Sequence, residues 1–310
     1  MLFLSLVAAA VFVVAGRATA PPGEEAEPAS WHLDRALEAA LAAPRPEAPP
    51  AVGIPAALGL AGGFGFRVED RSVETREVRP DPAAAGPCIA LVFDDLGYTT
   101  SGLAADLLEL PAEVTFAVLP GLAASEEFAR AAAARGHEIL LHLPMEPVDL
   151  HRHDPGHDAL LVELDSAENL ERLRRQLGGL PGYVGVSNHM GSRFTSRADL
   201  MGPVLREIRR HHEGLFFLDS STTPHSKVGT AARSAGLPYV ENNLFLDGGD
   251  EGAGPPSARV QQVARVALER GHAVAIGHVK RPTVHAVRAA IDGWQAQGIR
   301  LVRLSELVQH

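Results

Sequence analysis

The sequence predicts an α/β domain with a parallel β-sheet over residues 88–310. Three observations predict it: short apolar runs alternate with segments of helical periodicity, most of these runs are continuously apolar, and 46% of the 310 residues are hydrophobic. Continuously apolar strands are typical of parallel sheets that are covered on both faces. The apolar content is enough for one large domain or two small ones. The pattern fits an open sheet and a sheet closed into a barrel equally well.

Residues 1–20 predict a signal peptide or an N-terminal membrane anchor. Residues 1–16 are almost wholly apolar, and Ala18-Thr19-Ala20 matches the A-x-A pattern that precedes a signal-peptidase cut. An uncleaved run of this length would make only a marginal membrane span. In either form we expect the protein to be exported, to the periplasm or the extracellular space.

Residues 21–87 predict a tether rich in Pro, Ala and Glu, mostly disordered. Proline-rich stretches occur at 44–55 and 79–87, and helical spacing of apolar residues predicts one short amphipathic helix over 31–43. We expect this segment to carry no chemistry.

The predicted domain begins after Pro87 with alternating strand and helix patterns. The strands are expected at 89–93, 114–119, 138–142, 183–187, 215–218, 238–240, 273–276 and 300–303. The helices between them are expected at 101–110, 125–134, 167–177, 197–212, 226–235, 257–270 and 283–297.

Charge and cysteine content exclude several kinds of site. The 28 Lys and Arg against 38 Asp and Glu leave a net charge of −10, which argues against a dedicated nucleic-acid surface. Cys88 is the only cysteine, so an intramolecular disulfide and a cysteine-based zinc site are both excluded. Any bound metal must therefore be held by carboxylates and by some of the 14 histidines.

Carboxylates and histidines follow the first and third predicted strands, where chemistry collects in folds of this class. The run 89–93 leads directly into Asp94 and Asp95, a pair that can divide cation binding and proton transfer. A single Asp would suffice for the alternative role of a helix N-cap. His142 ends the third strand, and Glu146 follows four residues later. The alternative for His142 is a hydrogen-bonded core histidine.

Later strands bring further polar groups to the same edge. The fourth strand leads into a loop that contains His189, and His278 follows the strand at 273–276. Asp219 follows the fifth strand, where it either orients a histidine or caps a helix. The loop after the fourth strand also offers candidates for binding substrate, which are Asn188, Ser192 and Arg193.

Five motifs in this order resemble one family. The segment from about 88 to 310 is similar to the divergent polysaccharide deacetylases, also called YibQ-like, of the NodB-like carbohydrate esterase superfamily. The resemblance implies a distorted (β/α) barrel, a divalent cation that is most often zinc, and hydrolysis of N-acetyl groups on a sugar polymer. The motifs are Val92-Phe93-Asp94-Asp95-Leu96-Gly97, His142-Leu143-Pro144-Met145-Glu146, Asn188-His189-Met190-Gly191-Ser192, Phe217-Leu218-Asp219-Ser220 and Ile276-Gly277-His278.

The resemblance implies a role for each matching residue. Asp94 corresponds to the general-base aspartate and His278 to the general-acid histidine, whose orientation we assign to Asp219. Asp95 and His142 correspond to metal ligands. The ordinary family has a second histidine where this chain has Glu146, so the third ligand is expected to be His189, with Glu146 as the alternative.

The sequence therefore predicts a metal-dependent hydrolase that removes N-acetyl groups from an envelope or extracellular polysaccharide. Two alternatives remain open at this point. One is a non-catalytic module that binds an envelope glycan or a protein, and the other is an amidase with a non-sugar substrate. Aromatic residues make up only 5% of the chain, which is sparse for a protein that stacks sugar rings.

Overall fold

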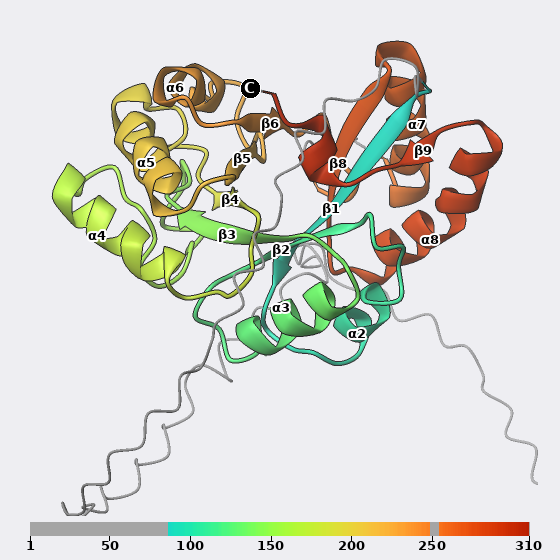
Figure 1. Cartoon of the computed structure of the whole chain (residues 1–310), viewed down its shortest axis with the longest axis horizontal. Coiled ribbons are helices and arrows are strands. Elements are labelled where there is room, and N and C mark those ends of the chain that lie inside the picture. Colours follow the sequence, from blue (N-terminus) through green and yellow to red (C-terminus); the bar gives the residue numbers. More distant parts are fainter. Residues whose placement is uncertain (1–85, 249–253, 310) are drawn as a thin grey trace, which may run out of the picture. The chain divides into compact units, whose positions relative to one another are not determined.

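The computed structural model describes residues 86–248 and 254–309, which form the predicted α/β domain (Figure 1). The predicted signal peptide or anchor and all but the last two residues of the predicted tether lie outside the described residues. Within the described part, no helix combines the length and the apolar character that crossing a membrane requires.

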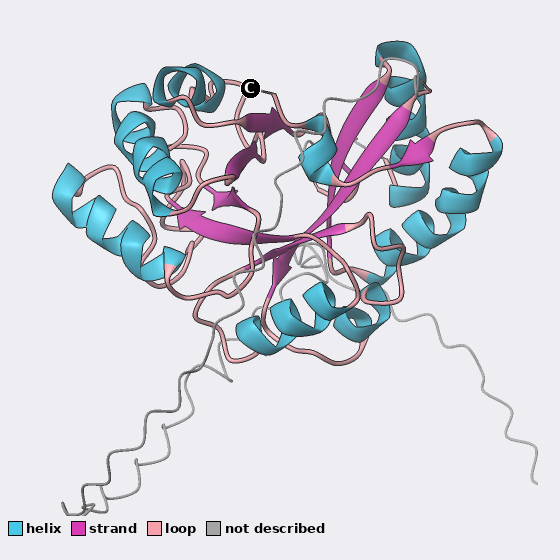
Figure 2. Cartoon of the chain, viewed as in Figure 1, coloured by secondary structure: helices cyan, strands magenta, loops and turns pink. Residues whose placement is uncertain are grey.

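All strand pairs of the main sheet are parallel, and the helices lie outside it (Figure 2). The strand order is β6-β5-β4-β3-β2-β1-β8-β7, and β9 pairs with β1. The strands are β1 (Cys88–Leu96), β2 (Thr115–Val118), β3 (Ile139–Met145), β4 (Gly185–Met190), β5 (Phe216–Asp219), β6 (Tyr239–Glu241), β7 (Leu244–Phe245), β8 (His272–His278) and β9 (Arg300–Leu301). The helices are α2 (Leu103–Leu107), α3 (Ser125–Ala134), α4 (Ser166–Leu177), α5 (Ala198–His211), α6 (Val228–Ala235), α7 (Pro256–Arg270), α8 (Arg281–Ala296) and a 3-10 helix (Leu304–Leu307).

A short crossing segment closes the sheet into a distorted barrel. The chain leaves β6, at the β5 end of the sheet, and enters β7, at the β8 end, after only two residues. The backbone amide of Asn242 donates to the carbonyl of Asp219 at 2.9 Å, and that of Asn243 donates to the carbonyl of Val274 at 3.0 Å. The predicted fold class, a distorted (β/α) barrel with parallel strands alternating with helices, is confirmed.

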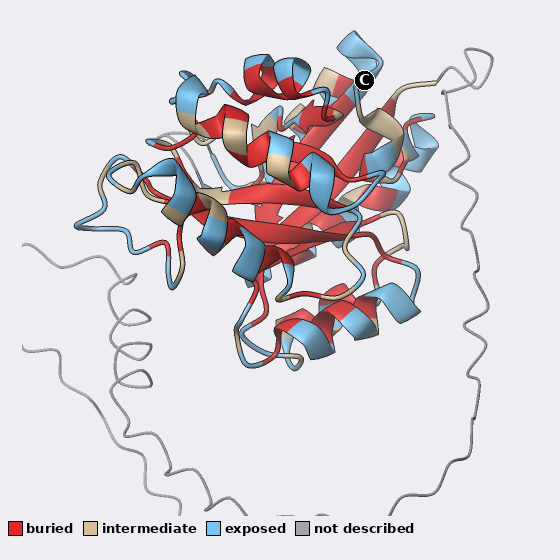
Figure 3. Ribbon diagram, turned by 60° about the vertical axis from the view of Figure 1, so that its left-hand side comes forward, coloured by how far each residue is buried: buried red, intermediate tan, exposed pale blue. Residues whose placement is uncertain are grey.

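The strands are buried on both faces, as their continuous apolar sequence predicts. In β1, Ile89, Leu91 and Phe93 belong to the large cluster that the inner faces of the helices also join, whereas Ala90 and Val92 belong to a smaller cluster. Figure 3 shows the buried strands and the helices that turn exposed residues outward. Because the strands pair in parallel, their carboxyl ends lie at the same edge of the sheet.

Several elements differ from the sequence prediction, and for β3 and β7 the physical reason is clear. The strand β3 continues through Pro144, although proline cannot donate a backbone hydrogen bond. It is tolerated because β2 pairs with β3 only as far as Leu141, so no neighbour on that side needs an N–H from Pro144. The strand β7 was not predicted, because two residues are too few to show a periodicity.

Candidate functional site

A cavity of about 330 Å³ opens at the carboxyl ends of the parallel strands. Its lining comes from β1, β3, β4, β7, β8 and the loop after β5, which meet because parallel strands end at the same edge. The titratable side chains in this lining are Asp94, Asp95, His142, His189 and His278. The structure thus brings together five of the residues that the sequence singled out.

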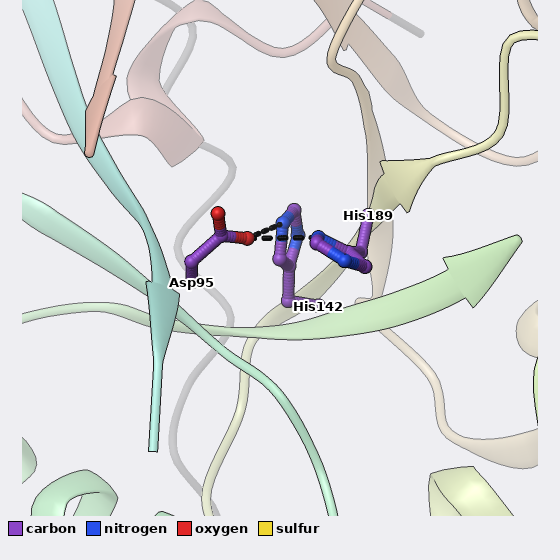
Figure 4. Close-up of side chains that lie close together, drawn as sticks. All are labelled: Asp95, His142 and His189. Carbon is purple, nitrogen blue, oxygen red and sulfur yellow. Dashed lines mark ion pairs between the residues drawn. The ribbon is translucent and has the colours of Figure 1, made fainter. Parts of the chain in front are cut away.

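Asp95, His142 and His189 point toward one another (Figure 4). Oδ1 of Asp95 lies 3.2 Å from Nε2 of His142 and 2.8 Å from Nδ1 of His189. The candidate ligand atoms of the three residues all lie within 4.8 Å of one another. Carboxylate oxygen and imidazole nitrogen are ligands that Zn²⁺ accepts, with three protein ligands typical of a catalytic site.

The contacts between Asp95 and the two histidines do not have the geometry of hydrogen bonds. They fit a cation that all three side chains of this triad would share. Oδ1 of Asp95 is buried, and neither imidazole meets it with hydrogen-bond geometry, so it has no hydrogen-bond partner among the described residues. Burial opposes ionisation of Asp95, but the two histidines outweigh it and hold the pKa of this carboxyl well below its usual range. An ionised oxygen that lies close to two imidazole nitrogens without hydrogen-bond geometry fits a divalent metal.

A β-bulge explains why two adjacent carboxylates both line the cavity. The pairing of β1 with β2 shifts between Phe93 and Leu96, so β1 contains one residue more than its partner there. Asp95 adopts a left-handed backbone conformation with φ of 62°, which is unusual for a residue with a side chain. In a regular strand, Asp94 and Asp95 would point to opposite faces of the sheet. This local strain at the cavity is typical of functional sites.

Ser187 orients His142. Its Oγ lies 2.8 Å from Nδ1 of His142, and both side chains are buried. With Nδ1 engaged, Nε2 of His142 faces Asp95. Ser187 was not among the predicted site residues, and its only signal in the sequence is its place in the strand that carries His189.

Asp94 is buried and largely unpaired. Its side chain is 3% exposed, Oδ1 has no hydrogen-bond partner among the described residues, and Oδ2 lies 3.5 Å from Nε2 of His142. Burial raises the pKa of Asp94, although the nearby His142 opposes the shift. A carboxylate with a raised pKa and a free oxygen suits a general base.

His278 is held by Asp247, not by Asp219. Its Nδ1 lies 2.6 Å from Oδ1 of Asp247, whose carboxylate also accepts a hydrogen bond from the His278 backbone amide at 3.0 Å and one from the Thr283 hydroxyl. Burial disfavours the imidazolium, but the bond to Asp247 and the charge of Asp95 outweigh it and raise the pKa of His278. The ring of Phe245 stacks beside His278, with centroids 6.1 Å apart.

The prediction that Asp219 orients His278 is therefore wrong. Oδ1 of Asp219 accepts from the backbone amide of Ser221 at 2.9 Å, and Oδ2 accepts from the Ser226 hydroxyl at 2.6 Å. Asp219 thus shapes the loop after β5. A signal for Asp247 was present in the sequence, because Leu244-Phe245-Leu246-Asp247 repeats the apolar run ending in Asp that precedes position 219.

Glu146 is not in the triad, which corrects the alternative for the third ligand. Its Oε1 lies 2.5 Å from Nη1 of Arg193, and its Oε2 accepts from the backbone amide of Val162 at 2.5 Å. Both oxygens are thus engaged, and Arg193 also pairs with Glu163 at 3.0 Å. Arg193, predicted to bind substrate, instead anchors the loop after β3.

The two other predicted substrate-binding residues also have structural partners. Ser192 lies outside the cavity lining, and its Oγ accepts from the backbone amide of Val148 at 2.9 Å. Asn188 lines the cavity, but its Nδ2 donates to the carbonyl of Met190 at 2.8 Å and its Oδ1 accepts from the amide of Ser220 at 2.9 Å. The second of these bonds joins β4, which extends through Asn188 and His189 to Met190, to the loop after β5.

Comparisons with known proteins agree with the motifs. The model of the family described as divergent polysaccharide deacetylase matches residues 91–308. The chain is 33% identical over 229 residues to the uncharacterized protein YibQ of Escherichia coli K12, covering 73% of this chain and 69% of YibQ. It is 29% identical over 219 residues to an uncharacterized protein of Haemophilus influenzae, covering 71% of this chain and 76% of the relative.

One solved structure shares the fold over most of the domain. The crystal structure of an uncharacterized protein from Agrobacterium tumefaciens C58 superposes with a TM-score of 0.67 at 29% identity. The match covers 74% of this chain and 92% of that chain.

Proposed function

The chain belongs to the divergent polysaccharide deacetylase family, and we propose that it is a metal-dependent hydrolase that removes N-acetyl groups from a polysaccharide. One observation carries the proposal. Three candidate ligands converge, namely Asp95, His142 and His189. Beside them lie Asp94, whose Oδ1 has no hydrogen-bond partner among the described residues, and His278, which is bound to the carboxylate of Asp247. Amide hydrolysis by activated water needs these components in one cavity.

Asp95, His142 and His189 would hold the cation, for which Zn²⁺ is our choice. When bound, such a cation lowers the pKa of water from about 15.7 toward about 7 and polarises the carbonyl of an amide. Ser187 keeps Nδ1 of His142 occupied, so that this ring presents a single nitrogen to the triad.

Asp94 would act as the general base. It takes a proton from water as the water oxygen forms its bond to the acetyl carbon. Its free Oδ1 is available to accept this proton, and the pKa raised by burial makes the carboxylate a better base.

His278 would act as the general acid. Its Nδ1 is bound to Asp247, and its Nε2 lies 3.8 Å from Oδ2 of Asp95 at the same cavity. The raised pKa keeps the imidazolium available near neutral pH. It gives a proton to the sugar nitrogen as the C–N bond breaks, so the products are acetate and a free amine.

The test is acetate release from N-acetylglucosamine oligomers by purified protein of measured metal content. Replacing Asp94→Asn should abolish turnover and leave metal content unchanged, because Asp94 is outside the triad. Equal loss of metal and turnover would contradict the division of roles.

Two other outcomes would overturn the substrate or the activity. Metal-free protein that binds the oligomer without releasing acetate would favour a glycan-binding module. Acetate release from simple N-acetyl amides and none from the oligomer would favour an amidase with a non-sugar substrate.

We also propose that the enzyme acts outside the cytoplasm, on an envelope or extracellular polysaccharide. The support is the apolar run and the A-x-A pattern within residues 1–20. Fractionation of cells that express the full chain tests it, and activity confined to the cytosol would contradict it.

A further inference from the structure

A second hollow adjoins the candidate catalytic cavity. It has a volume of about 280 Å³ and shares the side chain of His189 with that cavity. Loops at the carboxyl ends of β1, β2 and β3 form its walls. We call it the Tyr98 hollow, defined by Tyr98, Pro120, Pro144, Asp154, Asp158 and Arg175. The two hollows are therefore neighbours, with His189 in the lining of both.

Tyr98 stands out because it is a large aromatic side chain that remains 56% exposed. Its position is fixed by Gly97, which has φ of +119° and would place a Cβ 2.7 Å from Oγ of Ser125 and 3.1 Å from the carbonyl of Leu119. The carbonyl of Gly97 also accepts from the amide of Ala124 at 3.0 Å. The loop therefore presents Tyr98 from a tightly held backbone, three residues after the candidate ligand Asp95.

The opposite wall is also built before any ligand arrives. Arg175, in α4, contacts both carboxylate oxygens of Asp158, at 3.0 and 3.1 Å. The next residue, Gln176, donates to the carbonyl of His157 at 3.1 Å. These contacts tie the loop after β3 to α4, so the hollow is largely preformed, as ligand sites usually are.

The charge of the hollow restricts what it accepts. Its lining contains the carboxylates of Asp154 and Asp158, the imidazoles of His157 and His189, and one guanidinium, Arg175, which pairs with Asp158 at 3.0 Å and with Glu171 at 2.9 Å. The whole chain has a net charge of −10 as well. A neutral or amine-bearing ligand is favoured, and an acidic one is repelled.

We propose that the Tyr98 hollow binds the sugar next to the one that is deacetylated, with the face of a neutral or amine-bearing ring against Tyr98. This inference rests on the proposed function, because it assigns the neighbouring unit of the same polymer. It predicts that the enzyme discriminates oligomers from monomers and neutral or amino sugars from acidic ones.

The experiment compares N-acetylglucosamine with its tetramer as substrates. In the Tyr98→Ala variant we expect kcat/KM for the tetramer to fall about tenfold, the size of a typical aromatic contact, and that for the monomer to change less than about twofold. Tyr98→Phe should retain most of the activity, because the ring remains. Leu268→Ala, which removes an exposed side chain from the distant helix α7, is the matched control and should change neither value.

Binding of glucosamine tetramer, a product that cannot react, gives a second readout. Calorimetry should show weaker binding by Tyr98→Ala, and no binding of tetragalacturonate by the unaltered protein. If Tyr98→Ala changes kcat/KM for the monomer and the tetramer by the same factor, or changes neither value, the subsite is refuted. If no substrate releases acetate but Tyr98→Ala still weakens tetramer binding, the proposed function fails and the subsite stands.

Discussion

Asp247 offers the sharpest test of how His278 is positioned. Asp247→Asn keeps the shape of the side chain and removes its charge. The bond to Nδ1 of His278, at 2.6 Å, then becomes an ordinary hydrogen bond, and the amide group must also face the Thr283 hydroxyl. Replacing a charged hydrogen bond, worth about 1.5–3 kcal/mol, by a neutral one, worth about 0.5–1.5 kcal/mol, costs about 1–1.5 kcal/mol, which corresponds to a fall in kcat/KM of about 5- to 13-fold.

The assay is acetate release measured across pH, together with metal content. The alkaline limb of the pH profile should move to lower pH, because the bond to Asp247 raises the pKa of His278 and the variant weakens that bond. Metal content should stay unchanged, since Asp247 is outside the triad.

Asp219→Asn is the matched control, because Asp219 also follows an apolar run but bonds to Ser221 and Ser226. It should leave the pH profile in place. A fall of less than twofold for Asp247→Asn, or an equal shift of the profile in both variants, would refute the reasoning.

Three further predictions concern the metal and the loop after β3. Ser187→Ala removes the partner of His142 and should weaken metal affinity about 10- to 100-fold, measured by competition with a chelator; an unchanged Kd would contradict the role of Ser187. Glu146→Gln places an amide NH2 group against Arg193 or the Val162 backbone amide, so it should lower the free energy of unfolding by about 1–3 kcal/mol and leave metal content unchanged. Loss of metal in this variant would indicate that Glu146 is a metal ligand after all. Chelation should lower Tm reversibly, since a ligand at 1,000 times its Kd stabilises by about 4 kcal/mol, and a Tm indifferent to Zn²⁺ would count against the triad.

Local patterns accounted for much of the fold. The continuous apolar strands of β1 and β8 predicted burial on both faces, and the structure confirms it. Periodicity did not predict closure of the barrel, because closure depends on the crossing from β6 to β7 at Asn242 and Asn243. That crossing is a contact between strands distant in sequence, which no local pattern encodes.

The sequence by itself determined which chemical groups stand at the strand ends. Asp94, Asp95, His142, His189 and His278 follow apolar runs, and parallel strands necessarily bring such groups to one edge. Their roles as base, ligands and acid stay predictions that the experiments above address.

Only the tertiary structure decided which group pairs with which. Strand order places β7 beside β8, so Asp247 reaches His278, whereas β5 pairs with β4 and β6, so Asp219 turns to its own loop. In the same way, Glu146 meets Arg193 because β3 and β4 are neighbours. The reason is physical: a hydrogen bond requires its atoms to lie within about 3 Å, and the packing of the strands sets that distance.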